Sequence, residues 1–319
     1  MNQGRIGITM GDPGGVGPEV LVKALAELDR TDWPDLRVYG NKARLVETAM
    51  RLDLPNPMEL PNVEWVEHPE TESAEFAWGE LTSEGASAQV GYIQAALKDA
   101  SEGAISAIVT GPIHKQALAQ CGLPYHGHTE WLEDHFGVSQ AVMMLAGEKL
   151  RAVPVTVHIP LQEVPTQLTP ALLQETIEIV DRSMKSWFGM ESPRIAVCGL
   201  NPHAGDGGLL GKEDDAVIAP VLAKAREQGL DVSGPFPGDT VFFFASQGQY
   251  DVVLGMYHDQ ALGPFKLLHF DDGVNVTLGL PLLRTSVDHG TAYDIAGKGI
   301  ASASSMINAL TMAVTTRKG

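Results

Sequence analysis

Three apolar runs in this 319-residue chain each end in a histidine. They are residues 151–158, 194–203 and 250–258, which close with His158, His203 and His258. Apolar runs without polar alternation are typical of strands that are buried on both faces of a parallel sheet. We therefore expect three buried strands, each with an imidazole near its carboxyl end.

The rest of the chain alternates between strand-like and helix-like stretches. Helical periodicity is clearest in Thr169–Phe188, where apolar residues recur at spacings of four and three. Strands are further predicted at Ile6–Met10, Leu36–Tyr39, Ala104–Thr110 and Val274–Leu280, and helices at Pro18–Leu28, Lys42–Arg51, Ser87–Ala100, Asp214–Gln228 and Ser304–Val314. The acidic segment Glu64–Glu84 has little periodicity and is predicted to be an exposed loop or hairpin. Such alternation predicts an α/β sheet fold, with no linker to mark a domain boundary.

The three histidines are a candidate metal site, because ligands gather where the carboxyl ends of parallel strands meet. Three neutral imidazoles with an open fourth position make a catalytic centre of the zinc type. Asp206 and Asp259 follow two of the histidines and are candidates to orient an imidazole. Asp206 is explained equally well as a turn cap, and each histidine could instead pack or hydrogen-bond on its own.

The net charge of −18 argues against a nucleic-acid partner or an anionic membrane. An anionic substrate would then depend on locally placed cations, for which Lys115, Lys266 and Arg284 are candidates. No apolar run is long enough for a membrane span, and the start of the chain has no room for a secretory signal. Cys121 and Cys198 fit free thiols in a reducing compartment, so we expect a cytoplasmic protein.

Side chains suited to an anion clamp follow His258 at intervals of 8, 9 and 9 residues: they are Lys266, Asn275 and Arg284. Arg284 stands in a mostly apolar segment, where a charge is costly unless it is paired or faces a ligand. The alternative for Arg284 is an internal salt bridge. His128 and Thr129 could hold a carboxylate or phosphate oxygen, although Thr129 could also cap a helix.

Two glycine-containing segments are candidate ligand loops. Gly11–Glu19 lies between a strand and a helix start, where backbone amides suit an anion, but a tight structural turn explains it equally well. It is not the dinucleotide-binding fingerprint. Asp288–Gly299 is polar and rich in glycine, and it is similar to a loop that holds a nucleotide.

Taken together, these residues resemble the 4-hydroxythreonine-4-phosphate dehydrogenase family of vitamin B6 biosynthesis. The similarity covers nearly the whole chain, and its markers are the segments 11–19, 110–115, 127–130, 199–205, 256–260 and 273–292. The family shares its fold with isocitrate and isopropylmalate dehydrogenases. The resemblance therefore implies an α/β/α sandwich of two subdomains with a cleft between them. Residues 1–132 and 290–319 would form the first subdomain, and 133–289, with the metal-ligand histidines, the second.

The resemblance also assigns roles to the candidate residues. It implies that His158, His203 and His258 bind one divalent metal, and three imidazoles favour zinc or cobalt over magnesium. It implies that a small anionic phosphorylated substrate is held by His128, Thr129, Lys266, Asn275 and Arg284. A homodimer with active sites at the subunit interface is implied as well, so that the three metal ligands could come from two chains.

The segment 289–300 is similar to the adenosine-binding loop of isopropylmalate dehydrogenase. In that wider group an Asp-Ile pair in this loop goes with NAD, and a Lys-Tyr pair goes with NADP. This chain has Asp294 and Ile295, a few residues after Gly290. A carboxylate accepts a hydrogen bond from a ribose hydroxyl and would repel a 2′-phosphate, so we expect NAD, with NADP as the alternative. Tyr293 stands where the wider group usually has proline.

The implied reaction oxidises 4-phosphohydroxy-L-threonine to 2-amino-3-oxo-4-phosphooxybutanoate, which decarboxylates to 3-amino-2-oxopropyl phosphate. The metal would lower the pKa of the reacting hydroxyl and then polarise the ketone. Lys266 and Asp259 are the candidate catalytic bases. Three alternatives remain open: a sister dehydrogenase for phosphorylated threonate or erythronate or for a cyclic dihydrodiol acid, a zinc hydrolase or lyase without nicotinamide, and an inactive metal-binding protein.

Overall fold

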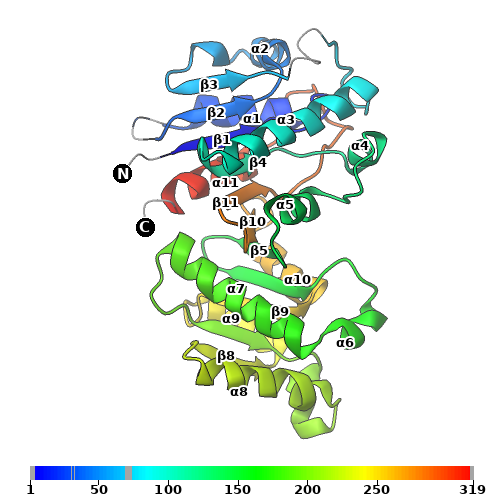
Figure 1. Cartoon of the computed structure of the whole chain (residues 1–319), viewed down its shortest axis with the longest axis vertical. Coiled ribbons are helices and arrows are strands. Elements are labelled where there is room, and N and C mark those ends of the chain that lie inside the picture. Colours follow the sequence, from blue (N-terminus) through cyan, green and yellow to red (C-terminus); the bar gives the residue numbers. More distant parts are fainter. Residues whose placement is uncertain (1–3, 30, 32, 69–73, 317–319) are drawn as a thin grey trace. The chain divides into compact units, whose positions relative to one another are not determined.

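The computed structural model describes residues 4–29, 31, 33–68 and 74–316, which form two compact α/β units (Figure 1). Unit 1 contains the residues up to Ser139 and from Leu280 onward, and unit 2 contains Gln140–Gly279. The boundaries predicted at 132/133 and 289/290 differ from this division. Helix α5 (His128–Phe136) continues past the first of them, and β11 (Leu283–Val287) pairs with a strand of unit 1.

Unit 1 is built on parallel strands in which the order of the chain reverses once. In sheet order the strands are β3 (Val63–Val66), β2 (Leu36–Tyr39), β1 (Arg5–Thr9), β4 (Ile105–Thr110) and β11. The chain builds β1, β2 and β3 in one direction and then crosses back to place β4 beside β1. In an open sheet, the crevice at such a reversal is where ligands bind.

The helices of unit 1 cover both faces of its sheet. Helix α3 (Ser83–Ser101) packs on β1, β2 and β4, whereas α1 (Gly17–Glu27) packs with α2 (Lys42–Arg51) and α11 (Ser304–Thr315). Right-handed crossovers account for this, because the connections before and after the reversal lie on opposite faces. Within its described residues, unit 1 also contains η1 (Pro57–Glu59), α4 (Lys115–Gln120) and α5.

Unit 2 has a mixed sheet. In sheet order its strands are β10 (Val274–Leu278), β5 (Val142–Ala146), β6 (Arg151–Thr156), β9 (Val252–Tyr257), β7 (Ile195–Cys198) and β8 (Val232–Phe236). Strand β5 runs antiparallel to both of its neighbours, and β6, β9, β7 and β8 are parallel. The three apolar runs that end near histidines are therefore neighbouring parallel strands, as the sequence predicts.

Helices cover the sheet of unit 2 as well. Helix α7 (Pro170–Phe188) packs on β10, β5 and β6 and against α8 (Ala219–Glu227), while α9 (Gly238–Ser246) and α10 (His258–Leu268) pack on β7, β9 and β6. Val241, Phe242, Ala261 and Phe265 of α9 and α10 share one buried cluster with residues of the strands. The short helices are η3 (Leu161–Glu163), α6 (Val164–Gln167), η4 (Pro202–Gly208) and the π-helical η5 (Asp214–Ile218).

Most predicted elements are confirmed, and one is confirmed only in part. Glu64–Glu84 was expected to be an exposed loop or hairpin, and its residues 67–68 and 74–82 form neither helix nor strand. Its first three residues belong to β3 and its last two to α3, while residues 69–73 lie outside the described part of the chain. Strand β3 is short, lies at the edge of the sheet and has an exposed glutamate, so its composition resembles that of a loop. None of the helices among the described residues is both long and apolar enough to cross a membrane.

Candidate functional site

His158 and His258 lie together at the ends of two neighbouring strands. Thr156, the last residue of β6, is in register with Tyr257, the last residue of β9. His158 follows β6 by two residues, and His258 opens α10 directly after β9. The centroids of the two imidazole rings are 5.9 Å apart, a separation that one bound cation could bridge.

His203 does not join this pair within the chain. Strand β7 ends at Cys198, and His203 lies five residues later on the exposed segment η4. Among the residues that the structure describes, no group of three His, Cys, Asp or Glu side chains could hold a metal. Three strand ends were expected to bring three imidazoles to one point. Within a single chain, only His158 and His258 of the three lie together.

The backbone around two of these histidines is unusual. His158 has a φ of 54°, and His203–Gly207 form five consecutive residues with left-handed backbone angles. Left-handed backbone costs a non-glycine residue roughly 1–2 kcal/mol and rarely extends over several residues. Strain of this kind persists only where the surroundings impose it, and it is concentrated at functional sites.

Two carboxylates support the histidine segments, and the sequence identified only one of them. Asp259 accepts a hydrogen bond from Nδ1 of His258 at 2.7 Å, which leaves the lone pair of Nε2 available to a ligand. Asp214, fully buried at the start of η5, accepts from the backbone amides of Leu200 and Asn201. It thereby fixes the segment that leads to His203. Asp206, the other candidate, lies exposed in the left-handed segment.

Unit 1 holds a buried cation next to a neutral imidazole. Arg284 on β11 is 3% exposed and donates from Nη2 to the Thr110 hydroxyl at 2.7 Å. Burial lowers the pKa of Arg284 to about 10. His128 is partly buried, and its shielded Nε2 makes no hydrogen bond with the described residues. Burial and the charge of Arg284 hold the pKa of His128 well below its usual 6.5.

Two histidines lie near the start of α5, and their surroundings differ: His126 is exposed to solvent, and His128 is partly buried. The side chain of His126 is 86% exposed, and both its backbone amide and its ring contact Glu130. His128 is the first residue of α5, with Gly127 as the N-cap. The alternative that Thr129 caps the helix is therefore wrong, and Thr129 lies in the first helical turn.

Lys266 and Asn275, the other predicted substrate ligands, belong to unit 2. Lys266 lies on α10 two turns after His258, and its Nζ is 5.6 Å from the ring centroid of Phe270. Asn275 lies on β10 opposite Leu145 of β5. Its Oδ1 is buried and makes no hydrogen bond within the described part of the chain, so this amide oxygen is available to a ligand.

The glycine-rich turn 11–19 is filled by the protein itself. Each of its residues is buried, and the carbonyl oxygen of Thr291 accepts a hydrogen bond from the Val16 amide at 2.9 Å. A Cβ at Gly15 would lie 2.8 Å from the same oxygen, so a glycine is required here. Of the two explanations for this turn, the structure favours tight packing over an open cradle for an anion.

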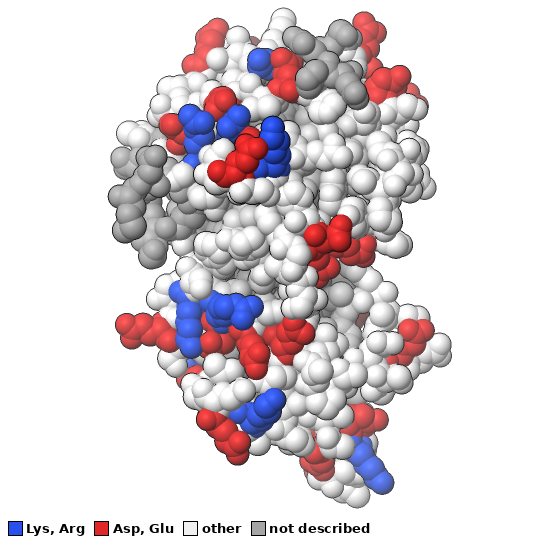
Figure 2. Space-filling view, viewed as in Figure 1, with Lys and Arg blue, Asp and Glu red and all other residues white. Residues whose placement is uncertain are grey.

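On the face drawn in Figure 2, some charged side chains lie in mixed groups and others in groups that are only acidic. In the mixed groups, lysine and arginine side chains lie beside aspartate and glutamate side chains of both units.

Comparison with known proteins assigns the family. The family model described as "Pyridoxal phosphate biosynthetic protein PdxA" matches residues 32–313. The chain belongs to the PdxA family. A 4-hydroxythreonine-4-phosphate dehydrogenase from Desulfosudis oleivorans is 46% identical over 320 residues, covering 97% of this chain and 95% of the relative. The family inferred from the sequence motifs is thus confirmed.

Solved structures support the same assignment and the fold. The crystal structure of 4-hydroxythreonine-4-phosphate dehydrogenase from Klebsiella pneumoniae matches with a TM-score of 0.89 and 38% identity over 99% of each chain. A terephthalate 1,2-cis-dihydrodiol dehydrogenase from Burkholderia xenovorans matches with a TM-score of 0.70 and 27% identity, covering 98% of this chain and 97% of that one. A β-decarboxylating dehydrogenase from Thermococcus kodakarensis, at 15% identity and a TM-score of 0.50, covering 98% of this chain and 83% of that one, shares the fold.

The environment of His128 predicts a pH dependence of stability. The folded chain keeps this ring neutral at a pH where the unfolded chain protonates it, because its pKa lies well below 6.5 in the folded state. The unfolded state then binds more protons, so the free energy of unfolding decreases as the pH falls below about 6.5. His128→Asn should remove this contribution, which is at most about 1.4 kcal/mol per pH unit.

Urea unfolding at pH 7, 6 and 5 measures the effect, with His126→Asn at the exposed neighbouring histidine as the matched control. We expect a flatter pH dependence for His128→Asn than for the wild type and the control. The same slope in all three proteins would contradict the predicted neutral state of His128.

Proposed function

We propose that this protein oxidises 4-phosphohydroxy-L-threonine with NAD in pyridoxal phosphate biosynthesis. The observation that carries the proposal is the buried guanidinium of Arg284 beside His128, in a chain of the PdxA family. A guanidinium presents several donors in one plane to the oxygens of an anion, and burial strengthens the attraction between the two charges. A phosphorylated substrate supplies such an anion.

Each part of the Arg284 site suits a phosphate or carboxylate group. The planar guanidinium can donate two parallel hydrogen bonds to neighbouring oxygens of one anion. His128 is neutral without ligand, so its Nε2 can carry a proton to donate or gain one when a dianion approaches. Thr129 stands in the first turn of α5, where backbone amides also favour an anion. On unit 2, Lys266 and Asn275 are the proposed substrate contacts.

The histidine pair of unit 2 fits a divalent metal. His158 and His258 face each other, and Asp259 fixes the tautomer of His258. Imidazole ligands favour zinc or cobalt, with magnesium as the family's third option. If a divalent cation is bound, His158 and His258 would hold it, and it would supply Lewis acidity for oxidation of a secondary hydroxyl. Because Asp259 is engaged by His258, we propose Lys266 as the base that accepts the hydroxyl proton.

We propose that His203 of a second copy of the chain completes the metal site in a homodimer. His203 is exposed on η4. Unit 2 also exposes large apolar side chains after η4, on α9 and at the end of α10: they are Leu209, Leu210, Phe243, Phe244, Leu267, Leu268 and Phe270. Exposed apolar groups of this size are typical of a surface that another protein covers. A second copy would bury them and bring a third imidazole.

The loop after β11 fits a nicotinamide dinucleotide. Asp294 is exposed, and nothing lies within 4 Å of a Cβ built on Gly290, so a ligand can approach both. The Asp294 carboxylate would accept from a ribose hydroxyl and repel a 2′-phosphate, with Ile295 beside it. These features favour NAD over NADP as the acceptor of the hydride from the substrate carbon.

The cytoplasm is the proposed compartment. Both cysteines are free, with Cys121 exposed and Cys198 buried. Free thiols persist in a reducing environment.

A sister activity is the second candidate. The similarity to the terephthalate dihydrodiol dehydrogenase extends over almost the whole of both chains. A cyclic dihydrodiol acid carries a carboxylate but no phosphate, and Arg284 could bind either group. Phosphorylated threonate or erythronate would use the same contacts.

The direct test follows NADH formation at 340 nm with 4-phosphohydroxy-L-threonine. We expect turnover with NAD, little with NADP because of Asp294, and loss on treatment with a chelator because of the histidine pair. Turnover with 4-phosphothreonate or a dihydrodiol acid alone would favour the sister activities. Hydrolysis or elimination without any change at 340 nm would instead favour a metal hydrolase or lyase.

Removal of the buried cation should weaken substrate binding selectively. Arg284→Met keeps the volume but loses the charge, and we expect the KM for the phosphorylated substrate to rise about 10- to 100-fold, as for loss of hydrogen bonds to a charged group. The KM for NAD should stay unchanged. Arg194→Met, at an exposed arginine paired with Asp251, is the matched control. An unchanged substrate KM for Arg284→Met would show that this cation is structural.

Mixing of two inactive variants tests the shared metal site. His158→Ala and His203→Ala should each lose bound metal, measured by elemental analysis, and activity. If the ligands come from two chains, a refolded 1:1 mixture should regain about a quarter of the wild-type activity, because half of the dimers are mixed and each of these has one complete site. No recovery, with mixed dimers shown by mass spectrometry, would place all ligands in one chain.

A further inference from the structure

The glycine-rich turn of unit 1 carries two buried acids whose contacts lie at opposite ends of one loop. Asp12 is 0% exposed and Glu19 is 1% exposed. Carboxylates are rarely buried unless they are hydrogen-bonded or paired. Both of these reach the segment 291–301, which contains Asp294 and Ile295 of the proposed nucleotide contacts and directly follows Gly290.

Asp12 holds the first end of this loop. Its carboxylate accepts hydrogen bonds from the Tyr293 hydroxyl, from the Gly14 amide at 2.8 Å and from Nε2 of Gln89 at 3.1 Å. Burial raises the pKa of the Tyr293 hydroxyl, so it remains protonated and acts as the donor. Thr291 lies two residues before Tyr293, and its carbonyl oxygen accepts a hydrogen bond from the Val16 amide. This adds a backbone contact at the same end of the loop.

Glu19 and Lys23 hold the second end. Glu19 accepts from the amides of Gly299, at 3.2 Å, and Ala301, at 2.7 Å. The Nζ of Lys23 contacts Glu19 at 2.7 Å and donates to the carbonyls of Gly299 and Ala301 at 3.0 and 2.7 Å. One carboxylate and one ammonium, a single turn apart on α1, thus satisfy both the donors and the acceptors of this loop end.

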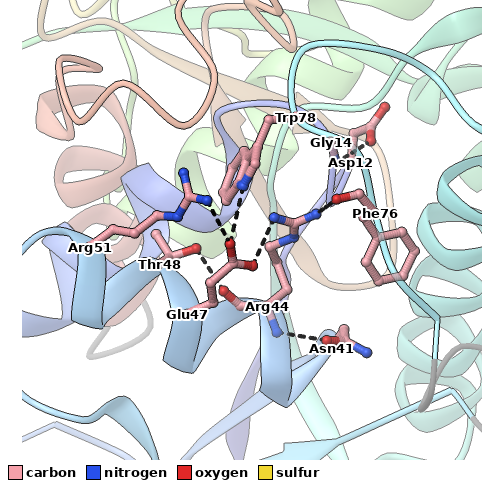
Figure 3. A network of polar contacts seen from close by, with 9 residues as sticks. All are labelled: Asp12, Gly14, Asn41, Arg44, Glu47, Thr48, Arg51, Phe76 and Trp78. Atoms are coloured by element: carbon pink, nitrogen blue, oxygen red, sulfur yellow. Dashed lines mark hydrogen bonds and ion pairs between the residues drawn. The ribbon is translucent and has the colours of Figure 1, made fainter.

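The middle of the loop rests on Trp78. A Cβ at Gly297 would lie 2.8 Å from Cδ2 of Trp78, and Gly297 has a φ of 73°, so a glycine is required. Figure 3 shows how Trp78 is held: its indole nitrogen donates to Glu47 at 3.4 Å, and the Arg44 guanidinium lies 4.0 Å from the ring centroid. The middle of the loop therefore packs against a side chain that is itself held in place, and both of its ends are hydrogen-bonded.

Tyr293 also joins the loop to the reversal of strand order. Its ring is parallel to that of His114 within 4°, with centroids 5.3 Å apart. His114 follows β4, and Asp12 follows β1, so Tyr293 contacts the segments after both strands that flank the reversal. Tyr293 thus connects the first end of the loop to both of these segments.

We propose that Asp12 with Tyr293, and Glu19 with Lys23, form a two-ended clamp that holds residues 291–301 in the conformation that binds the dinucleotide. The four side chains are positioning residues, since none of them is assigned a contact with the cofactor. The inference rests on the proposed function in one respect, namely that NAD binds through Gly290 and Asp294.

The clamp would lower the entropic cost of binding. Ordering one residue costs roughly 1–2 kcal/mol, and a loop already ordered does not lose this free energy when the ligand arrives. The clamp also accounts for the left-handed backbone of Ala292, with a φ of 43°, between the two anchored residues Thr291 and Tyr293. Asp294 follows directly and is turned to solvent.

The first experiment compares Tyr293→Phe with Tyr39→Phe. Each variant removes one tyrosine hydroxyl bonded to an aspartate of unit 1, but the Tyr39 hydroxyl bonds to Asp99, away from the loop. In Tyr293→Phe we expect about tenfold faster amide hydrogen exchange in 291–301 without ligand, and about tenfold weaker NADH binding by fluorescence. The substrate KM and the kcat at saturating NAD should not change. Tyr39→Phe should alter neither loop exchange nor NADH binding.

Lys23→Met tests the other end without touching Asp12. It should speed exchange of the Gly299 and Ala301 amides and weaken NADH binding in the same way, even if Tyr293→Phe fails to fold. Unchanged exchange of 291–301 in the folded variants, or an equal effect of Tyr39→Phe, would overturn the clamp. Failure of the wild type to bind NADH would overturn the proposed cofactor instead, and the exchange measurements on ligand-free protein distinguish the two results.

Discussion

Burial of both faces of the sheets is the constraint on which the rest of this structure depends. In strands such as β1, β4, β6 and β9 nearly all consecutive side chains are buried, so both faces of these strands are covered. Polar groups that take part in chemistry are therefore displaced to the strand ends, where the chain leaves the sheet. His158, His258 and Asp12 occupy such positions, which is why both units carry their candidate chemistry at carboxyl ends of strands.

Arg284 is the exception to this constraint. It lies within β11, opposite Ile108 of β4, and its charge is carried into the interior. Asp12 and Glu19 are buried as deeply but are satisfied by donors from the loop 291–301. Buried charges therefore have two different roles in unit 1. The acids accept hydrogen bonds from the protein's own loop, whereas the guanidinium of Arg284, whose pKa burial lowers to about 10, is the proposed contact for a substrate anion.

In unit 2, a segment with left-handed backbone angles is held in place by side chains that bond to its base. The left-handed turn His203–Gly207 is held at its base by Asp214, and Gln260 of α10 links the same segment to β9, since it donates to the Gly199 carbonyl and accepts from the Met256 amide. The segment is thus fixed although His203 itself is exposed. A rigid and exposed imidazole near exposed apolar side chains is what a shared site in a dimer requires.

The sequence by itself determined the strands and helices with strong periodicity, the family and the candidate residues. Leu36–Tyr39 and Lys42–Arg51 begin and end as predicted, and the three apolar runs are neighbouring parallel strands. These features depend on side-chain period and order along the chain, which are local. Only the tertiary structure decided that β3 is a strand, that β11 belongs to unit 1, and that Asp12, Glu19 and Asp214 accept hydrogen bonds from other parts of the chain. The reason is physical: hydrogen-bond partners that lie far apart in the chain, such as Glu19 and Ala301, leave no signal in the local pattern.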